Sequence, residues 1–417
     1  MAGPSAGESP HLLLLARYLP PAINGGIYRP TAMMRAAERR GWRVTAISQP
    51  LLKEPTAAGL ELAGTIPRSV RLLNYAEPLP GDASHYFAPR LSGGHDVIEP
   101  ILAAARRACQ DTPPALVMAS GPPFAEFVAA LVLSQEWRIP LALDYRDEWT
   151  QCPFPFVGVG NADWFWERRC LKKASLVFFT TESQRVHQIR SFPQLDPTRT
   201  AVAPNGSHED GAAPHRPAAV SPDLPTIAFL GTLGEHNDLG EFLATLDEAV
   251  ALNPALAGGV RIAFVGTKPP NEREILARFP HQEVIQAIDH VPLSEAQAIM
   301  RGSAALLLFN PPRLARYIPG KAYDYMAARS RIVLYGEGGE LDRLLADYPW
   351  AMRVNRRDAR ALMDVLSRIA GGLGPVEGTI SQEFLARISR DRSAEQMVIA
   401  LEKLLPSQLA ISSPAVA

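Results

Sequence analysis

Short apolar runs alternate with segments of helical periodicity along almost the whole of this 417-residue chain. The first run, residues 12–16, is apolar at every position and therefore suits a strand that is covered on both faces. A Pro/Gly loop follows it, then a helix over residues 30–40 and a second apolar run over 44–47. Because strand, helix and strand repeat in this order, the sequence predicts an α/β fold with parallel sheets.

The length of the chain and one irregular stretch predict two domains. Domains usually contain about 100–200 residues, so one core is not enough here. Residues 207–224 are rich in Gly, Pro, Ser, His and Ala without periodicity, which is typical of a linker. We therefore expect one Rossmann-like domain over residues 1–206 and another over 225–390. A helix over 391–405 could pack on either domain, and a disordered tail is expected over 406–417.

Charge and cysteine content exclude several classes of function. Lys and Arg number 42 against 43 Asp and Glu, a formal net charge of −1, so no overall basic field exists to bind nucleic acid. The three cysteines are far apart and lack the spacing of zinc ligands. Neither a basic leader nor a long apolar segment precedes the first strand. We expect a cytoplasmic protein with reduced thiols, no metal site, no bound cofactor and no nucleic-acid partner.

The strongest local signal is a loop in the second half, between the apolar runs 304–309 and 331–335. Residues 317–321 read Tyr-Ile-Pro-Gly-Lys and lead into a helical segment, Ala-Tyr-Asp-Tyr-Met-Ala. This order places Gly320, Lys321 and free backbone N–H groups at a helix N-terminus beside a parallel sheet, where a phosphate group binds well. A lysine there opposes the helix dipole unless an anion is bound. The alternative is a solvated first-turn lysine.

Three more charged residues surround this motif. Arg313 and Arg316 carry planar donors that suit phosphate or carboxylate groups, and a structural salt bridge explains them equally well. Asp324 could accept a hydrogen bond from a ribose or sugar hydroxyl, or could be a charge on the helix surface. All three are candidate donor-site residues.

A second polar cluster follows the apolar run 141–143, at the strand end where open α/β sheets place ligands. Asp144, Arg146 and Asp147 put three charges into four residues, and a salt bridge within the cluster would account for one aspartate. The other, preferably Asp147, could accept the proton of an acceptor hydroxyl as a catalytic base. Arg146 could contact the same acceptor. Trp149 could stack on a sugar or could belong to the core.

In the first loop of the chain, Gly25 and Gly26 permit backbone geometries that other residues avoid and a close approach to a ligand. A simple turn would need no ligand.

Several motifs together resemble the GT-B-fold glycosyltransferases. They are the two halves in this order, the Gly-Gly loop after the first strand, Pro-Asn-Gly over residues 204–206, and Pro-x-Lys before the Tyr-Asp-Tyr-Met-Ala helix. More narrowly, residues 11–405 are similar to the large retaining family that builds bacterial surface polysaccharides and natural-product glycosides. The resemblance implies a nucleotide-sugar donor on the second domain, an acceptor on the first, and catalysis without an obligatory metal.

The resemblance also implies roles for particular residues. Lys321 would contact the donor diphosphate, Gly231 and Thr232 would form the opposite wall, and the Gly-Gly loop would face the donor phosphates. Many family members have two glutamates in this region, the second at the position of Asp324. The chain departs from that pattern, because the residue eight positions before Asp324 is Arg316.

The segment 163–173 mixes aromatic and basic residues and could dock peripherally on an anionic membrane surface at the inner face of the membrane. Ala162, Trp166, Cys170 and Ala174 fall on one helical face, as packing against a core would require. Both interpretations stay open.

The sequence thus predicts an enzyme that moves a sugar from a nucleotide diphosphate sugar to a hydroxyl of a glycan, a lipid-linked glycan or a small molecule. Two alternatives are a sugar-nucleotide 2-epimerase of similar fold and a non-catalytic nucleotide-binding scaffold. The scaffold alternative rests on Arg316, which occupies a position where a donor-site glutamate is common in the family that the chain resembles.

Overall fold

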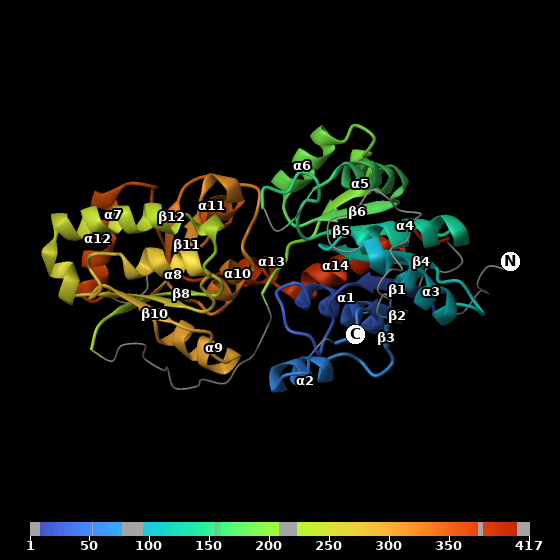
Figure 1. Cartoon of the computed structure of the whole chain (residues 1–417), viewed down its shortest axis with the longest axis horizontal. Coiled ribbons are helices and arrows are strands. Elements are labelled where there is room, and N and C mark those ends of the chain that lie inside the picture. Colours follow the sequence, from blue (N-terminus) through green and yellow to red (C-terminus); the bar gives the residue numbers. More distant parts are fainter. Residues whose placement is uncertain are drawn as a thin grey trace. The chain divides into compact units, whose positions relative to one another are not determined.

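The computed structural model describes residues 9–51, 53–76, 95–154, 157, 159–207, 223–373 and 378–406. The chain forms two compact units, one made of Met1–Asn205 with Arg390–Ala417 and one made of Gly206–Ser389 (Figure 1). Most of the predicted linker and nearly all of the predicted tail lie outside the described residues.

The first unit is built on a seven-stranded parallel sheet in the order β3-β2-β1-β4-β5-β6-β7. The chain runs from the central strand β1 outward to β3 and then returns to β4 on the other side of β1. In such sheets the carboxyl ends of the strands at this reversal form the usual ligand site. The strands are β1 (His11–Ala16), β2 (Arg43–Ser48), β3 (Arg71–Asn74), β4 (Leu116–Gly121), β5 (Leu141–Tyr145), β6 (Leu176–Phe179) and β7 (Thr200–Val202).

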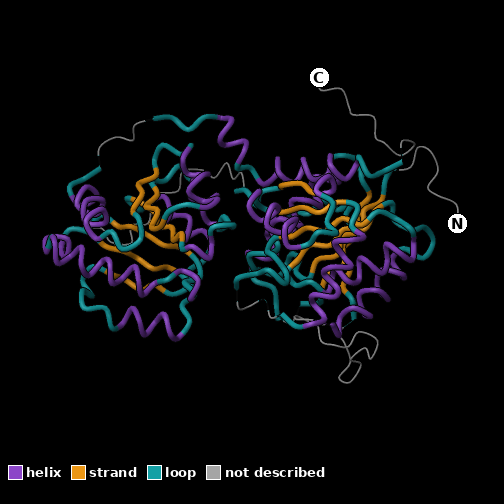
Figure 2. The backbone as a smooth tube through the Cα atoms, turned by 90° about the horizontal axis from the view of Figure 1, so that it is seen from above, coloured by secondary structure: helices purple, strands orange, loops and turns teal. Residues whose placement is uncertain are grey.

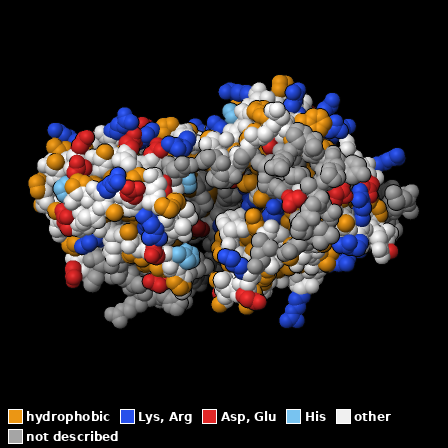
Figure 3. Space-filling view, viewed as in Figure 1, with side chains coloured by type: hydrophobic (Ala, Val, Ile, Leu, Met, Phe, Trp, Pro, Cys, Tyr) orange, Lys and Arg blue, Asp and Glu red, His pale blue; other side chains and the backbone are white. Residues whose placement is uncertain are grey.

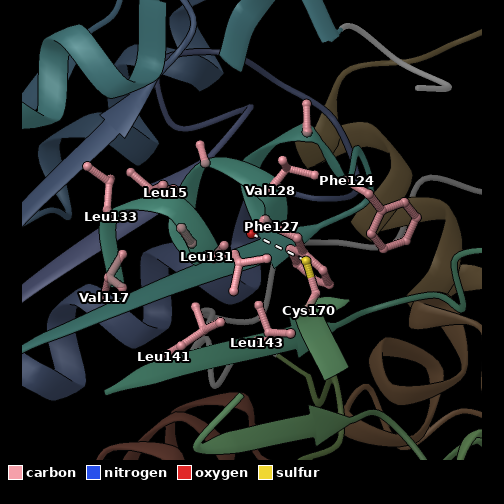
Figure 4. Packing of buried hydrophobic residues seen from close by; sticks show 14 of the residues in the cluster. Leu15, Val117, Phe124, Phe127, Val128, Leu131, Leu133, Leu141, Leu143 and Cys170 are labelled. Carbon is pink, nitrogen blue, oxygen red and sulfur yellow. Dashed lines mark hydrogen bonds between the residues drawn. The ribbon is translucent and has the colours of Figure 1, made fainter. Parts of the chain in front are cut away.

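Helices cover both faces of this sheet (Figure 2). Leu13 and Leu15 of β1 belong to a core with α3, α4 and α5, whereas Leu12 and Leu14 belong to a core with α1 and α14. Figure 4 shows α4 side chains over those of β4 and β5, with the Cys170 thiol of α5 donating to Phe127 O. The helices are α1 (Tyr28–Arg39), α2 (Ala57–Gly64), α3 (Ile98–Ala108), α4 (Ala125–Trp137), α5 (Asn161–Lys173), α6 (Glu182–Ser191) and α14 (Arg390–Glu402).

The second unit repeats the plan with six parallel strands in the order β10-β9-β8-β11-β12-β13. Helices α7 and α12 contribute to the core on one face, and α9, α10, α11 and α13 to the core on the other. The strands are β8 (Thr226–Leu230), β9 (Arg261–Val265), β10 (Ile285–Ile288), β11 (Ala305–Asn310), β12 (Ile332–Gly336) and β13 (Ala351–Val354). The helices are α7 (Leu239–Leu252), α8 (Pro270–Ala277), α9 (Leu293–Gly302), α10 (Gly320–Ala327), α11 (Gly339–Ala346), α12 (Ala359–Ala370) and α13 (Gln382–Arg387). In the described part of the chain, no helix combines the length and the apolar character that crossing a membrane requires.

The last helix, α14, returns to the first unit and packs on α1. Met397, Val398 and Leu401 join the core beneath α1, and Arg40 pairs with Glu402 at 2.8 Å. The position of this helix, which the sequence left open, is therefore set by an apolar stripe with an ion pair at its edge.

The structure confirms the predicted fold class of two parallel α/β sheets. Two strands were not predicted, β3 and β13. Both lie at the edge of their sheet and mix charged or exposed residues with apolar ones, so neither reads as a buried run.

Glycines with positive φ follow or end three strands of the second unit. Gly231 follows β8 with φ +112°, Gly266 follows β9 with φ +125°, and Gly336 ends β12 with φ +124°. A Cβ atom at Gly266 would collide with Gly231 O, and one at Gly336 would collide with Asn310 O. The ends of β8 and β9, and those of β11 and β12, can therefore lie this close only because Gly266 and Gly336 have no side chain.

The substitution Gly266→Ala tests this constraint. Strained backbone alone should lower the free energy of unfolding by roughly 1–3 kcal/mol, and the collision adds to that loss. Gly240→Ala is the matched control, because Gly240 lies in α7, where an added Cβ would meet no atom within 4 Å, and this variant should lose nothing. Urea unfolding compares the two, and equal stability of both variants would contradict the argument.

Candidate active site

The N-terminus of α10 meets the end of β8 at the carboxyl edge of the second sheet. The backbone N–H of Leu230, the last residue of β8, donates to the hydroxyl of Tyr325 at 2.8 Å. Tyr325 is buried in α10, so this hydrogen bond fixes the helix against the strand. The predicted phosphate-binding loop is therefore held beside the loop that follows β8.

Lys321 reaches back from the first turn of α10 over β8. Its Nζ lies 3.5 Å from the centroid of the Phe229 ring, and a Cβ at Gly231 would be 3.2 Å from Nζ. Burial lowers the pKa of Lys321 to about 7 from its ordinary value of 10.5. Among the described residues, no carboxylate forms an ion pair with Lys321. In the described part of the chain, the Lys321 amine thus lies beside a ring face rather than a carboxylate, at a helix end that favours anions.

The predicted residues Gly231, Thr232 and Gly320 lie around Lys321. Gly231 donates to Val265 O and Leu233 donates to Thr267 O, so the loop after β8 is tied to the end of β9. Thr232, between them, is exposed. The first backbone N–H groups of a helix have no partner within the helix, so Gly320 adds a donor to this place.

Arg313 and Arg316, by contrast, take part in contacts within the protein. Arg313 forms an ion pair with Asp238, which also lies 3.4 Å from Arg356. Arg356 in turn pairs with Glu241 at 2.6 Å. The structural salt bridge that the sequence allowed for Arg313 is therefore present. The guanidinium of Arg316 lies 5.8 Å from the centroid of the Tyr317 ring.

Asp324 lies on α10, nearly one turn after Lys321, and is partly buried. Residues three positions apart share one face of a helix, so the carboxylate and the ammonium are on the same side of α10. The charge of Asp324 contributes to the raised pKa of the neighbouring Tyr325, although burial is the larger cause.

In the first unit, Asp144 forms a buried ion pair, and its partner is Arg29 rather than Arg146. Arg29 Nε lies 2.9 Å from one oxygen of Asp144 and 3.0 Å from the other, and the Ser120 hydroxyl donates to the carboxylate at 2.8 Å. Asp144 is 1% exposed. The salt-bridge interpretation therefore describes Asp144, and its proposed catalytic role is corrected because no face of the carboxylate is open to a substrate.

Arg146 is held by backbone carbonyls. Its Nε donates to Gly121 O at 3.2 Å and its Nη2 donates to Pro122 O. A Cβ at Gly26 would collide with Nη1 of Arg146, so the loop after β1 and the loop after β5 are in contact. Burial lowers the pKa of Arg146. The structure thus brings together two residues that the sequence singled out separately. Gly25 is exposed, and a Cβ there would meet no atom within 4 Å.

Asp147 follows Arg146 and is partly buried. Burial raises the pKa of its carboxyl group above the usual 3.8, and the Arg146 charge offsets part of that rise. A carboxylate with a raised pKa is a stronger base. The raised pKa of Asp147 is therefore compatible with its predicted role as a catalytic base.

Trp149 does not provide a sugar-stacking surface in this structure. Its side chain is fully buried, stacks on Phe124 at 4.9 Å between ring centroids, and donates from Nε1 to Asp163 at 2.9 Å. The acceptor-binding role predicted for Trp149 is therefore corrected to a core role, which the sequence had kept as the alternative.

Two residues of these sites, Phe229 and Arg29, were not identified from the sequence. Phe229, which lies under Lys321, reads only as part of a buried strand. Arg29, the partner of Asp144, sits in the first turn of a helix, where an arginine is unremarkable unless its burial is known. In the sequence, the only sign of an unusual role for Arg29 is its place just after the Gly-Gly loop.

Solved structures match the two units over nearly the whole chain. Sucrose-phosphate synthase from Thermosynechococcus elongatus has a TM-score of 0.66 at 14% identity, covering 95% of this chain and 99% of that chain. HepE from Anabaena, in complex with UDP-glucose, has a TM-score of 0.62 at 13% identity, covering 94% and 99%. UDP-GlcNAc 2-epimerase from Methanocaldococcus jannaschii has a TM-score of 0.56 at 11% identity, covering 94% and 99%. These likenesses establish the GT-B fold.

A family model matches the sequence of the first unit. Residues 24–206 match the family model of the glycosyl transferase 4-like domain. The matched part runs from the loop before α1 to the residues after β7. The chain therefore carries a glycosyltransferase-family domain, and the predicted resemblance is confirmed. No curated protein sequence matches the chain significantly.

Asn substitutions separate the two aspartates of the first unit. Asp144→Asn leaves Arg29 buried without its counter-charge and should cost roughly 3–5 kcal/mol of unfolding free energy. Asp147→Asn removes a carboxylate whose ionised form is disfavoured by burial, so stability should be unchanged or slightly higher. Urea unfolding distinguishes them, and an Asp144→Asn variant as stable as Asp147→Asn would contradict the structural assignment of Asp144.

The titration of Lys321 can be observed directly, because the chain has only six lysines. In protein labelled with ¹³C-lysine, one Cε resonance should titrate at about pH 7, far below the ordinary lysine value of 10.5. Bound pyrophosphate should raise that midpoint, because an anion favours the ammonium form. The resonance should be absent in Lys321→Met, whereas Lys403→Met, at an exposed lysine, should leave it in place. A titration of Lys321 near 10 would show that the side chain is solvated.

Proposed function

We propose that this protein is a glycosyltransferase that moves a sugar from a nucleotide diphosphate sugar to a hydroxyl acceptor, with retention of anomeric configuration and without a metal ion. The observation that carries the proposal is Lys321, a partly buried lysine at the N-terminus of α10 with no carboxylate partner among the described residues. The glycosyl transferase 4-like domain of residues 24–206 supports the class of reaction.

The donor diphosphate would bind between α10 and the loop after β8. Lys321 would supply one positive charge, and the N–H groups of Gly320 and Thr232 would donate hydrogen bonds. In the reaction, the bond between the anomeric carbon and the diphosphate oxygen breaks and negative charge grows on the leaving group. Donors fixed at the place where charge develops stabilise the transition state without further reorganisation.

The binding of the diphosphate would also change the protonation of Lys321. With the site empty, burial holds its pKa at about 7, so the uncharged amine is well populated near neutral pH. A bound dianion favours the ammonium form, and donor binding would take up a proton at neutral and alkaline pH. Asp324, on the same side of α10, would accept hydrogen bonds from ribose or sugar hydroxyls.

The acceptor would bind on the first unit at the loop after β5. Asp147 would accept the proton of the acceptor hydroxyl while the oxygen of that hydroxyl forms a bond to the anomeric carbon, on the face from which the diphosphate leaves, as retention requires. Arg146, placed against Gly26, would orient the acceptor. Asp144 would hold the strand end through Arg29 and take no part in proton transfer.

The nucleotide of the donor and the chemical class of the acceptor have to be identified by experiment. HepE from Anabaena has been solved with UDP and with UDP-glucose, which makes uridine donors the first to test here. The acceptor classes are a glycan, a lipid-linked glycan and a small molecule. Arg316 stands where a glutamate is common in similar proteins, so the sugar has to be found by a panel.

The experiment combines binding and turnover. Thermal unfolding with UDP-, GDP-, ADP- and dTDP-sugars, with and without EDTA, should show a rise in midpoint for one nucleotide family, because a ligand that binds only the folded state stabilises it. With that donor, Lys321→Ala should lower kcat/KM by about 100-fold or more, whereas the matched surface change Lys403→Ala should not alter it. Unchanged turnover in Lys321→Ala would contradict the donor-site assignment.

Two outcomes would point to the alternatives. Isomerisation of the donor sugar without acceptor, followed by NMR, would identify a sugar-nucleotide 2-epimerase, whose fold this chain shares. Nucleotide binding without hydrolysis, transfer or isomerisation would identify a scaffold protein.

A further inference from the structure

The outer face of α5 carries the exposed aromatic residues of the protein. Of the Trp, Phe and Tyr side chains that the structure describes, only Trp164 and Phe165 are exposed, at 41% and 53%. They are adjacent in the sequence and lie in the first turns of α5. Exposed apolar groups of this size gathered in one place mark an interaction surface more often than a single exposed leucine does.

The charged residues of α5 are sorted by sign. Its two carboxylates are buried: Asp163 accepts from Trp149 Nε1 at 2.9 Å and from the Gly160 N–H at 2.7 Å, and Glu167 accepts from the Thr150 N–H at 2.9 Å. Its four basic residues are all exposed, namely Arg168, Arg169, Lys172 and Lys173. The helix therefore turns its negative charge inward and its positive charge outward.

The aromatic and basic side chains share one face of the helix. Trp164, Arg168 and Lys172 are four residues apart and form one row, and Phe165, Arg169 and Lys173 form the row beside it. The guanidinium of Arg169 lies 5.3 Å from the centroid of the Phe165 ring, so an aromatic and a basic side chain of this face are joined by a cation–π contact. We call these six residues the α5 outer face.

Part of the α5 outer face is fixed by packing. The Trp164 ring lies 6.0 Å from the ring of Phe192, which is buried, so one side of the indole rests on the core and the other is open. Figure 3 shows basic (blue) and hydrophobic (orange) side chains, with a pale-blue histidine, along the upper edge of the region where Figure 1 labels α6 above α5. Packing on Phe192 therefore holds Trp164 at the surface.

We infer that the α5 outer face docks on an anionic membrane surface. Aromatic rings favour the headgroup region of a bilayer, and basic side chains beside them are attracted to the negative potential of anionic lipids. The face offers both features and no carboxylate of α5 that would oppose them. A bilayer interface satisfies both features at once, because lipid phosphate groups lie there beside apolar acyl chains.

The inner face of α5 connects this surface to the candidate acceptor site. Asp163 and Glu167 bind Trp149 and Thr150, which follow Asp147 in the loop after β5. A membrane held against the outer face would therefore lie one helix thickness from that loop, about 10 Å. Among the acceptor classes of the proposed function, on which this step rests, the placement favours one that is anchored in lipid.

Vesicle flotation with the full chain tests the inference. The protein should float with phosphatidylcholine vesicles that contain phosphatidylglycerol, should not float with phosphatidylcholine alone, and should be released by high salt. Lys172→Gln with Lys173→Gln should lower the partition coefficient by about 30-fold, the effect expected for two basic residues at an anionic surface. Phe165→Ser should lower it independently of salt, because it removes an apolar anchor.

The matched control removes the same charge elsewhere. Arg360 and Arg368 are exposed on α12 of the second unit, and replacing both by Gln should leave flotation unchanged. Equal loss in both double variants would show a general charge effect and would overturn the assignment to α5, as would failure of the unchanged protein to float. Flotation needs neither donor nor acceptor, so its result is independent of the test of the glycosyltransferase reaction.

Discussion

The ion pair between Arg29 and Asp144 joins distant parts of the first unit. Arg29 belongs to α1 and Asp144 to β5, and Ser120 of β4 donates to the same carboxylate. A further Arg29 nitrogen, Nη1, donates to Ala203 O at 2.6 Å and Pro204 O at 3.0 Å, at the end of the first half of the chain. A buried charge pair is costly unless each group is satisfied in this way. The loop that carries Gly26 leads into α1 and the loop that carries Arg146 and Asp147 follows β5, so the pair fixes one end of each loop.

The second unit reaches a comparable arrangement by other means. Glycines close the distance between β8 and β9 and between β11 and β12, and the hydroxyl of Tyr325 fixes α10 to β8. The cation at this edge is Lys321, which rests on the face of Phe229. The first sheet edge therefore neutralises its buried charge internally, whereas at the second edge no described carboxylate forms an ion pair with Lys321.

The sequence predicted the class of fold because strands such as β1 and β11 are almost entirely apolar and wholly buried, which only a doubly covered sheet accommodates. It missed β3 and β13, whose register depends on a neighbouring strand rather than on their own composition. In the site, the position of Gly320 and Lys321 at a helix N-terminus beside the sheet could be predicted, because these residues are contiguous with the helix that follows. The partner of Asp144 could not, since Arg29 lies 115 positions earlier, and the burial of Trp149 depends on contacts with Phe124 and Asp163.

The return of α14 to the first unit makes the second unit an insertion in the first. The chain leaves the first unit after Asn205 and comes back at Arg390, and the two junctions lie side by side, since Ser207 pairs with Ser389 and Arg390 donates to Asn205 O at 3.3 Å. No single cut divides the protein into its folding units, because the first would lose the helix that completes its core. Replacement of the second unit by another would therefore require two adjacent junctions, after Asn205 and before Arg390, and would leave both chain segments of the first unit in place.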